Sequence, residues 1–543
     1  MPGALQGLGL IERRLNADLV VQLGQHSNTR TNRAWRLTSR TLKLAGDTGI
    51  DALRLRNPAD LPAALAAFQG GGIRHIALQG AGFADHHLAQ LPATLTSLTL
   101  DMCSGLSAQG LSHLARLSRL HTLDLGRSPV GTDGLAVIDH LPRLKTLKAA
   151  ATRLAASVGE HIRAHPSLEE IDMSDNTLND ATFAALAENP RLASLKLMSA
   201  GVSSLAARAL AEGCPALRRL DLTENQFDDH AAGALLRKPS LSELDLSVNG
   251  ISEAPLAALA DNTTLRSLAL RNVGFNPAMA HAVATNASLV SLDIAVNNAE
   301  PEVADILTAH PALRVLHAAD NRFDDTSLRA LADMELESLQ ISDNDITEEG
   351  VDYLLRNNRT LSDLDISQAA CDGSGCLADG IEAHPRLQRL LIDNTALGNE
   401  DFIALGKHPQ LRELGLSNSD VDDAALAALA RSGSVGTLDI SYNQAVTAEG
   451  LSAYRDNAAL RTLDVSALRL GTAEARALAA MPGLKHLVAN RARMDDDTAL
   501  ALASLPSLET LDLSEVRLRP ETRAALSAPR TPNTGPRVRL GAF

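Results

Sequence analysis

The chain has 543 residues, of which 45% are hydrophobic and only 2% aromatic, and it carries a formal net charge of −15. This acidity argues against a nucleic-acid groove, which needs a basic stripe. No stretch approaches the roughly 18 apolar residues of a membrane span, and no secretory signal opens the chain. We therefore expect neither nucleic acid nor membrane as a partner.

Residues 1–48 differ from the rest because they show no repeat phase and contain the single tryptophan. The segments 15–26 and 33–43 resemble the opening and closing helices of an F-box, with Asn16 where that motif usually has Pro and Thr31-Asn32 where it usually has Asp-Leu. The resemblance implies a face that binds the F-box adaptor, made by Leu15, Leu19, Leu23, Leu37 and Leu42. The alternative is an amphipathic cap that shields the first repeat.

From residue 49 to 525 the chain repeats an L-x-x-L-x-L core about every 24 residues, as in Leu217/Leu220/Leu222. The last two apolar positions alternate around one polar residue, which predicts a short strand in each repeat. A helical segment follows it, as in 324–332, 422–430 and 495–503. We predict an α/β fold: a leucine-rich repeat solenoid, or horseshoe, of about 20 repeats, with parallel strands on the concave face and short helices on the convex face.

Two polar patterns recur within the repeats. Eight residues after the first leucine stands an asparagine in seven repeats (Asn176, Asn225, Asn249, Asn297, Asn321, Asn344 and Asn443). We expect these amides to point inward and satisfy backbone groups. Pairs such as His165-Pro166 and His384-Pro385 end several helical segments, where a protonated His would suit the negative helix end. We interpret both patterns as structural and expect no metal site.

The sequence contains no catalytic motif: no phosphate-binding Gly-Lys loop, no H-E-x-x-H, no nucleophile elbow and no C-x-x-C. The four cysteines show no disulfide framework, which fits a reducing compartment. Two of them, Cys371 and Cys376, fall in a repeat stretched to about 26 residues, where inert thiols are favoured over a regulatory pair. Residues 526–543 are expected to form a C-terminal cap or tail. We predict neither an enzyme nor a cofactor.

The polar residue between the two strand leucines is predicted to face the concave side. It is an aspartate in nine repeats, here called the aspartate column: Asp124, Asp172, Asp221, Asp245, Asp293, Asp365, Asp439, Asp464 and Asp512. Lys148, Lys196, Leu391, Gly415 and Val488 interrupt it. Either the column only keeps the surface solvated, or it binds a protein target. In the second case we expect contacts from Asp221, Asp245, Asp293, Asp365, Asp439 and Asp464, with an exposed Leu391 near Tyr442 as an apolar anchor.

An F-box-like segment followed by 24-residue repeats with Ala-Leu-Ala helices, as in 424–430, resembles the GALA family of type III effectors of plant-pathogenic bacteria. The likeness covers residues 50–525, although the motif G-A-x-A-L-A is not intact. It implies a substrate-binding subunit of a host SCF ubiquitin ligase, delivered into the host cytosol. The alternative is a scaffold or inhibitor that binds one protein without adaptor recruitment.

Overall fold

The computed structural model describes residues 52–67, 73–155, 157–527 and 536–540, and the F-box-like leucines lie outside these residues. The chain forms two compact units, one ending at Leu268 and one starting at Ala269. Within the described residues, no helix has both the length and the apolar character needed to cross a membrane.

The strands of the first unit have three to five residues each, and each pairs in parallel with the next along the chain. The second leucine of each repeat is aligned with that of its neighbours, as in Leu220 and Leu244. The strands of this unit are β1 (Ala52–Leu55), β2 (His75–Gln79), β3 (Ser97–Asp101), β4 (Thr122–Asp124), β5 (Thr146–Lys148), β6 (Glu170–Asp172), β7 (Ser194–Lys196), β8 (Arg219–Asp221) and β9 (Glu243–Asp245). Strand β10 (Ser267–Ala269) spans the unit boundary.

The strands of the second unit follow the same parallel pattern. They are β11 (Ser291–Asp293), β12 (Val315–His317), β13 (Ser338–Gln340), β14 (Asp363–Asp365), β15 (Arg389–Leu391), β16 (Glu413–Gly415), β17 (Thr437–Asp439), β18 (Thr462–Asp464), β19 (His486–Val488), β20 (Thr510–Asp512) and β21 (Arg537–Arg539). Strand β21 lies in the segment that the sequence assigns to the cap, and it adds a parallel partner to β20.

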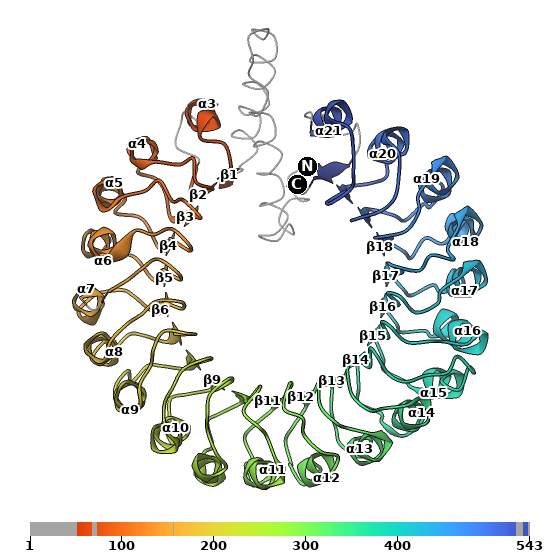
Figure 1. Cartoon of the computed structure of the whole chain (residues 1–543), viewed down its shortest axis with the longest axis horizontal. Helices are drawn as coiled ribbons and strands as arrows, with labels where there is room; N and C mark the ends of the chain where they lie inside the picture. Colours follow the sequence, from red (N-terminus) through yellow and green to blue (C-terminus); the bar gives the residue numbers. More distant parts are fainter. Residues whose placement is uncertain (1–51, 68–72, 156, 528–535, 541–543) are drawn as a thin grey trace, which may run out of the picture. The chain divides into compact units, whose positions relative to one another are not determined.

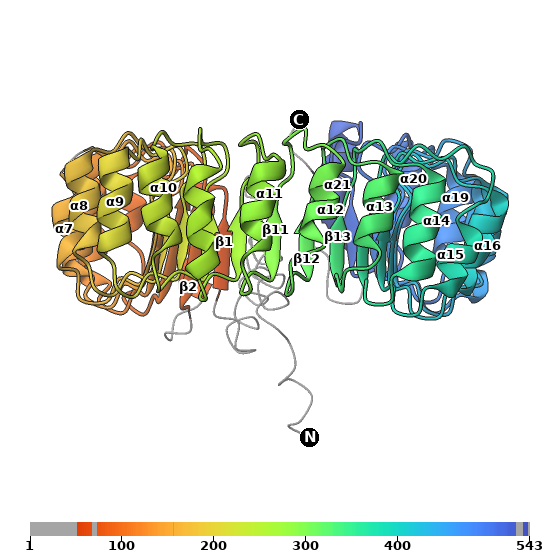
Figure 2. The ribbon, with the colours of Figure 1, turned by 90° about the horizontal axis from the view of Figure 1, so that it is seen from below.

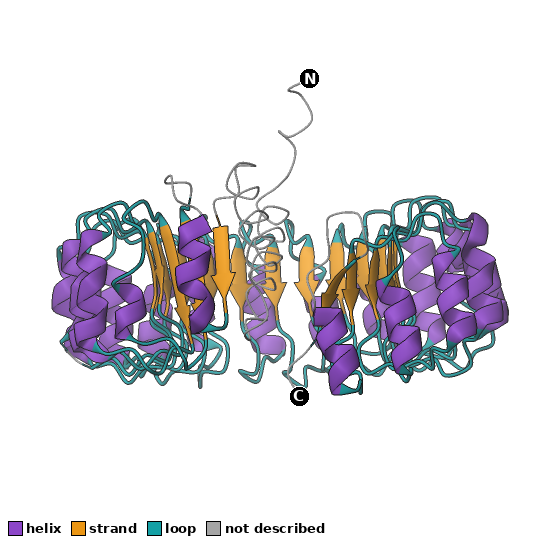
Figure 3. Ribbon diagram, turned by 90° about the horizontal axis from the view of Figure 1, so that it is seen from above, coloured by secondary structure: helices purple, strands orange, loops and turns teal. Residues whose placement is uncertain are grey.

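In each unit the strands form the inner layer and the helices the outer layer (Figures 1 and 3). The first unit has helices α3 (Leu61–Ala67), α4 (Asp85–Leu88), α5 (Ala108–Leu111), α6 (Gly131–Leu135), α7 (Val158–Arg163), α8 (Asp180–Ala187), α9 (Ser204–Glu212) and α10 (Asp229–Leu236), with 3₁₀ turns η1 (Pro58–Asp60), η2 (Ser112–Arg116), η3 (Ala136–His140) and η4 (Ala254–Asp261). The predicted fold class, an α/β solenoid of parallel strands and short helices, is confirmed.

The helices of the second unit run side by side along its outer face (Figure 2). They are α11 (Pro277–Ala284), α12 (Glu302–Leu307), α13 (Asp325–Leu331), α14 (Glu348–Asn357), α15 (Ala378–Ala383), α16 (Asn399–Lys407), α17 (Asp423–Leu429), α18 (Ala448–Ser452), α19 (Thr472–Ala479), α20 (Asp496–Ala503) and α21 (Pro520–Ser527), with the 3₁₀ turn η5 (Ala453–Asp456). Three of the helical segments expected from the sequence begin at an N-cap aspartate, Asp324, Asp422 or Asp495, whose carboxylate accepts a backbone N–H of the first helical turn.

The asparagine ladder is confirmed, and Asn225 shows its geometry. Its Nδ2 donates to the carbonyls of Leu197, Leu222 and Thr223 at 2.8–3.0 Å. Its Oδ1 accepts the backbone N–H of Val202 at 2.8 Å, and its own N–H donates to Asn249 of the next repeat. One buried amide therefore satisfies the turning backbone of two adjacent repeats, which explains its recurrence without any catalytic role.

The His-Pro pairs are structural, but the expected protonated imidazole is wrong. The side chains of His165, His310, His384 and His408 are all buried. Nδ1 of His408 accepts the backbone N–H of Leu411, and its Nε2 donates to the carbonyl of His384 at 2.9 Å. Burial lowers the pKa of all four histidines, that of His384 to about 4. They are neutral at pH 7, because burial outweighs the helix-end field.

Candidate functional site

The nine aspartates of the aspartate column are half-buried, and all nine share one structural contact. In each, one carboxylate oxygen accepts the backbone N–H of the residue two positions later, at 2.8–3.1 Å. The strand ends at that point, so this N–H has left the sheet ladder. The column therefore has a role inside the fold, which accounts for its repetition without requiring a ligand.

The charges along the column are not uniform. Lys148 lies in register between Asp124 and Asp172, and Lys196 lies between Asp172 and Asp221. Opposite charges therefore alternate from β4 to β8, and strands that pair in a sheet lie about 5 Å apart. In the sequence, these lysines interrupt an acidic column. In the sheet, each lysine lies beside two carboxylates on the neighbouring strands.

Two places in the column bring carboxylates directly together. Asp221 pairs in register with Asp245, and Asp439 pairs with Asp464. Burial raises the pKa of Asp245, and the charge of Asp221 adds to the rise. Burial likewise raises the pKa of Asp464, with contributions from Asp439 and Asp512. Each of these two pairs therefore concentrates negative charge on the strand face.

Asp293 differs from the other site aspartates. Burial by itself would raise its pKa, but a hydrogen bond from His317 and the charge of Arg271 bring the pKa below its ordinary value. The Arg271 guanidinium lies 3.4 Å and the His317 ring 3.8 Å from its carboxylate. Asp293 is thus already paired within the chain, and it has less charge left for a partner than Asp221 has.

Leu391 is less exposed than the sequence suggests. It is half-buried, and its Cδ2 lies over Gly415 of the next strand, only 2.6 Å from where a Cβ on that glycine would stand. Tyr442 is exposed, and its hydroxyl lies 3.5 Å from Nη1 of Arg491, two repeats further along the chain. The hydrogen-bond contact of Tyr442 is thus with Arg491, and the anchor role expected of Leu391 with Tyr442 stays a prediction.

The four cysteines are free, and three of them have a raised pKa, which disfavours the reactive thiolate. Burial raises the pKa of Cys103 and Cys214 to about 11, and burial and four nearby carboxylates raise that of Cys371 to about 12. Exposed Cys376 lies 2.8 Å from the hydroxyl of Ser374. No group of three or more His, Cys, Asp or Glu side chains suited to a metal ion occurs in the described residues.

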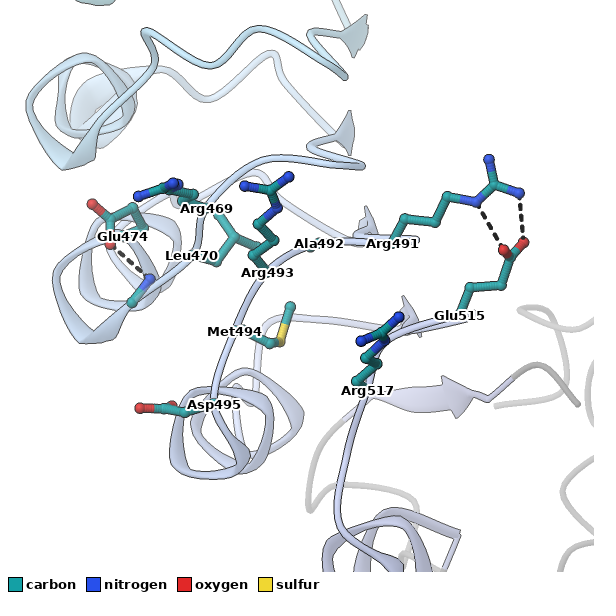
Figure 4. Close-up of a pocket in the computed structure, with 11 residues that line it drawn as sticks. Arg469, Leu470, Glu474, Arg491, Ala492, Arg493, Met494, Asp495, Glu515 and Arg517 are labelled. Carbon is teal, nitrogen blue, oxygen red and sulfur yellow. Dashed lines mark hydrogen bonds and ion pairs between the residues drawn. The ribbon is translucent and has the colours of Figure 1, made fainter. Parts of the chain in front are cut away.

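A second feature, which the sequence analysis missed, is a cavity of about 920 Å³ at the loops before α19, α20 and α21 (Figure 4). It contains four arginines: Arg469, Arg491, Arg493 and Arg517. Three of them stand 24 positions apart, which is the repeat length, so they occupy the same place in three consecutive repeats. That spacing was the signal available in the sequence.

The comparisons with known proteins agree with the repeat architecture. A family model described as Leucine Rich repeat matches residues 334–355 and 435–453. The chain therefore contains leucine-rich repeats and has the solenoid fold that such repeats build. No match was found among curated proteins.

Two solved structures resemble this leucine-rich repeat chain at low sequence identity. A chain in the crystal structure of the mouse RP105/MD-1 complex is 15% identical, with 86% of this chain and 94% of that chain covered and a TM-score of 0.48. A chain in the TLR13-ssRNA13 complex is 18% identical, with coverage of 90% and 70% and a TM-score of 0.42.

Proposed function

We propose that the protein is a binding module whose concave strand faces hold a protein partner with a basic surface. The observation that carries this proposal is the register pairing of Asp221 with Asp245 and of Asp439 with Asp464. Each aspartate of a pair uses one oxygen to accept the backbone N–H two residues later. Burial and the neighbouring carboxylate disfavour the negative charge of Asp245 and of Asp464. A Lys or Arg from a partner would relieve that cost, so the faces favour cationic protein surfaces.

In its finer form, the proposal is that the protein acts as an effector of the GALA type in a host cytosol. There the leucines Leu15, Leu19, Leu23, Leu37 and Leu42 would recruit the F-box-binding adaptor of an SCF ubiquitin ligase, and the repeats would present a target for ubiquitination. This rests on the resemblance of residues 15–26 and 33–43 to F-box helices. The repeat architecture supports the target-binding half, because stacked repeats offer extended concave surfaces for partners.

The test is binding of purified F-box-binding adaptor to the full chain and to the double variant Leu19→Ala/Leu23→Ala. We expect the wild type to bind and the variant to lose binding. Leu205→Ala/Leu500→Ala is the matched control, because both leucines are exposed on the outer helices. If the wild type does not bind adaptor but still captures one protein from plant cytosol, the protein is a scaffold or inhibitor instead. Equal adaptor binding by both variants and the wild type would remove the F-box assignment.

A further inference from the structure

The cavity before α19, α20 and α21 lies entirely in the second unit. Arg469 lies on the loop that leads to α19, and Arg493 lies at the same position before α20, where the two residues form a parallel bridge. Arg517 takes that position before α21. Because bridged neighbours in parallel chains are spaced by about 5 Å, the three side chains start from a row roughly 10 Å long.

The guanidiniums of Arg469, Arg493 and Arg517 are exposed, and within the described part of the chain no ion pair or side-chain hydrogen bond is assigned to them. Figure 4 shows the three arginines at the cavity, with dashed lines at Glu474 and between Arg491 and Glu515 only. Three like charges in one row repel one another. The protein has a net charge of −15, so the row is a local positive region on a negatively charged molecule. A row of this kind is expected to need an anion.

The acidic residues of the cavity are already engaged elsewhere. Oε2 of Glu474 accepts the backbone N–H of Gly471 at 2.8 Å, and Asp495 accepts that of Thr498 at 2.8 Å as the cap of α20. Glu515 forms two hydrogen bonds with Arg491, at 2.8 and 3.2 Å. The hydrogen bonds of these carboxylates thus go to helix caps and to the fourth arginine, and the four arginines still outnumber the three carboxylates that line the cavity.

Three apolar residues line the cavity alongside the charged ones, and we call these three residues the floor. Leu470 and Ala492 are buried, and Met494 is half-buried. The volume of about 920 Å³ falls within the range of pockets that hold small organic ligands. It is several times larger than a single inorganic anion needs. The shape therefore favours a ligand with an organic body on the floor and its negative charge at the arginine row.

We propose that this cavity binds a small organic molecule that carries a diphosphate or two neighbouring phosphate groups. Arginine matches phosphate oxygens with two parallel N–H donors, and two phosphates can engage two or three guanidiniums of the row at once. A single carboxylate would engage one guanidinium and leave the others unpaired. A phosphorylated peptide is a different partner, and it would need a groove that continues beyond these three repeats.

The test is calorimetric titration of the full chain with pyrophosphate, a nucleoside diphosphate, and citrate at matched ionic strength. We expect one site that binds pyrophosphate at least about tenfold more tightly than citrate, since charge-assisted bidentate contacts favour phosphate. The nucleoside diphosphate should bind more tightly still, because its organic body covers the apolar floor. Equal affinity for citrate, or no binding of either phosphate compound, would overturn the proposal.

Variants separate this site from non-specific charge. Arg469→Gln/Arg493→Gln/Arg517→Gln should weaken pyrophosphate binding by about a hundredfold or more. The control Arg386→Gln/Arg431→Gln/Arg455→Gln removes the same charge at exposed positions outside the cavity and should bind as the wild type does. Equal losses in the two triple variants would overturn the proposal. Thermal unfolding of both variants checks that each is folded.

A gain of affinity provides a test that misfolding cannot imitate. Glu515→Gln removes the carboxylate that holds Arg491, so a fourth guanidinium becomes available to the ligand. We expect pyrophosphate to bind at least about threefold more tightly. Unchanged or weaker binding would contradict the proposed position of the phosphates. Binding of a doubly phosphorylated peptide, with none of pyrophosphate or nucleoside diphosphate, would assign the row to a protein partner and overturn the small-molecule proposal.

Discussion

The Oδ1 atom of Asp393 accepts a hydrogen bond of 2.7 Å from the backbone N–H of Ser417, in the following repeat. In nine repeats the corresponding N–H is held by the aspartate two residues earlier, but here that position is Gly415, which has no side chain to offer. Asp393 supplies the missing carboxylate from the neighbouring repeat. Burial raises its pKa, and the charges of Asp439 and Asp365 add to the rise. The hydrogen bond to Ser417 thus forms although burial and nearby carboxylates disfavour the charged form of Asp393.

Removing this carboxylate should destabilise the second unit. Asp393→Ala leaves the N–H of Ser417 without its acceptor, and we expect a loss of about 1 kcal/mol in the free energy of unfolding, the usual net value of one such bond. Asp393→Asn keeps an acceptor oxygen and loses only the charge, so it should be close to neutral or slightly stabilising. Urea unfolding of both variants measures the difference. Equal stabilities for the two would show that the bond contributes little.

The asparagine ladder predicts a larger effect in the first unit. Asn225→Ala leaves three carbonyls and one N–H without their side-chain partner, and we expect a loss of about 2–4 kcal/mol, since each buried unsatisfied group is costly. Asn225→Ser should cost less, because Ser419 occupies the same place in another repeat and donates to two carbonyls. Hydrogen exchange of the Val202 amide, which loses its acceptor, should show the loss of protection. Protection that stays at the wild-type level would contradict the ladder's role.

Much of the fold could be predicted from the sequence because it depends on periodic contacts. The spacing of Leu217, Leu220 and Leu222 determines which side chains point inward, and an amide such as Asn225 can repeat its bonds wherever the backbone turns in the same way. The helix caps at Asp324 and Asp422 are local, so they too were accessible. These features require only neighbours along the chain or one repeat away.

The properties of the site could be predicted only in part, because they depend on directions that periodicity does not give. The pattern places Asp293 in the column, but it does not reveal that Arg271 and His317 reach its carboxylate. It places Leu391 on the strand, but it does not reveal that the Leu391 side chain covers Gly415. The arginine row is visible as a 24-residue spacing, but only the side-chain contacts reveal that it forms no ion pair with the described residues.

The buried histidines predict a loss of stability in acid. Burial lowers the pKa of His384 in the folded protein to about 4, below its value in the unfolded chain. The neutral buried ring therefore contributes its full stability above the unfolded-state pKa, and this stability is lost as the pH falls toward the folded-state pKa. By pH 5 the loss should be about 2 kcal/mol, from about 1.4 kcal/mol per pH unit below 6.5. Asn358 fills the equivalent position in the preceding repeat, where it donates to the carbonyls of Ala332 and Met334. His384→Asn should therefore lose less stability than the wild type between pH 7 and 5.

Urea unfolding at both pH values gives the comparison for His384→Asn. The control is His113→Asn, which removes an exposed imidazole and should follow the wild type at both pH values. The difference between the two variants isolates the buried ring from the many carboxylates that titrate over the same range. A wild-type acid response in His384→Asn would exclude this histidine as the cause.

The proposed binding face predicts distinct kinetic effects for aspartates that look alike in the sequence. Asp221→Asn/Asp245→Asn keeps the oxygen that caps the backbone but removes two neighbouring charges, so the fold should be preserved while association with a basic partner slows several-fold at low salt. Asp293→Asn should change the association rate less, because Arg271 and His317 already offset its charge. Leu391→Ala should mainly speed dissociation if its half-buried side chain contacts the partner. Association and dissociation rates, measured at two salt concentrations against a protein captured from cytosol, separate these effects. Wild-type rates in all three variants would place the partner elsewhere, on the loops or the outer helices.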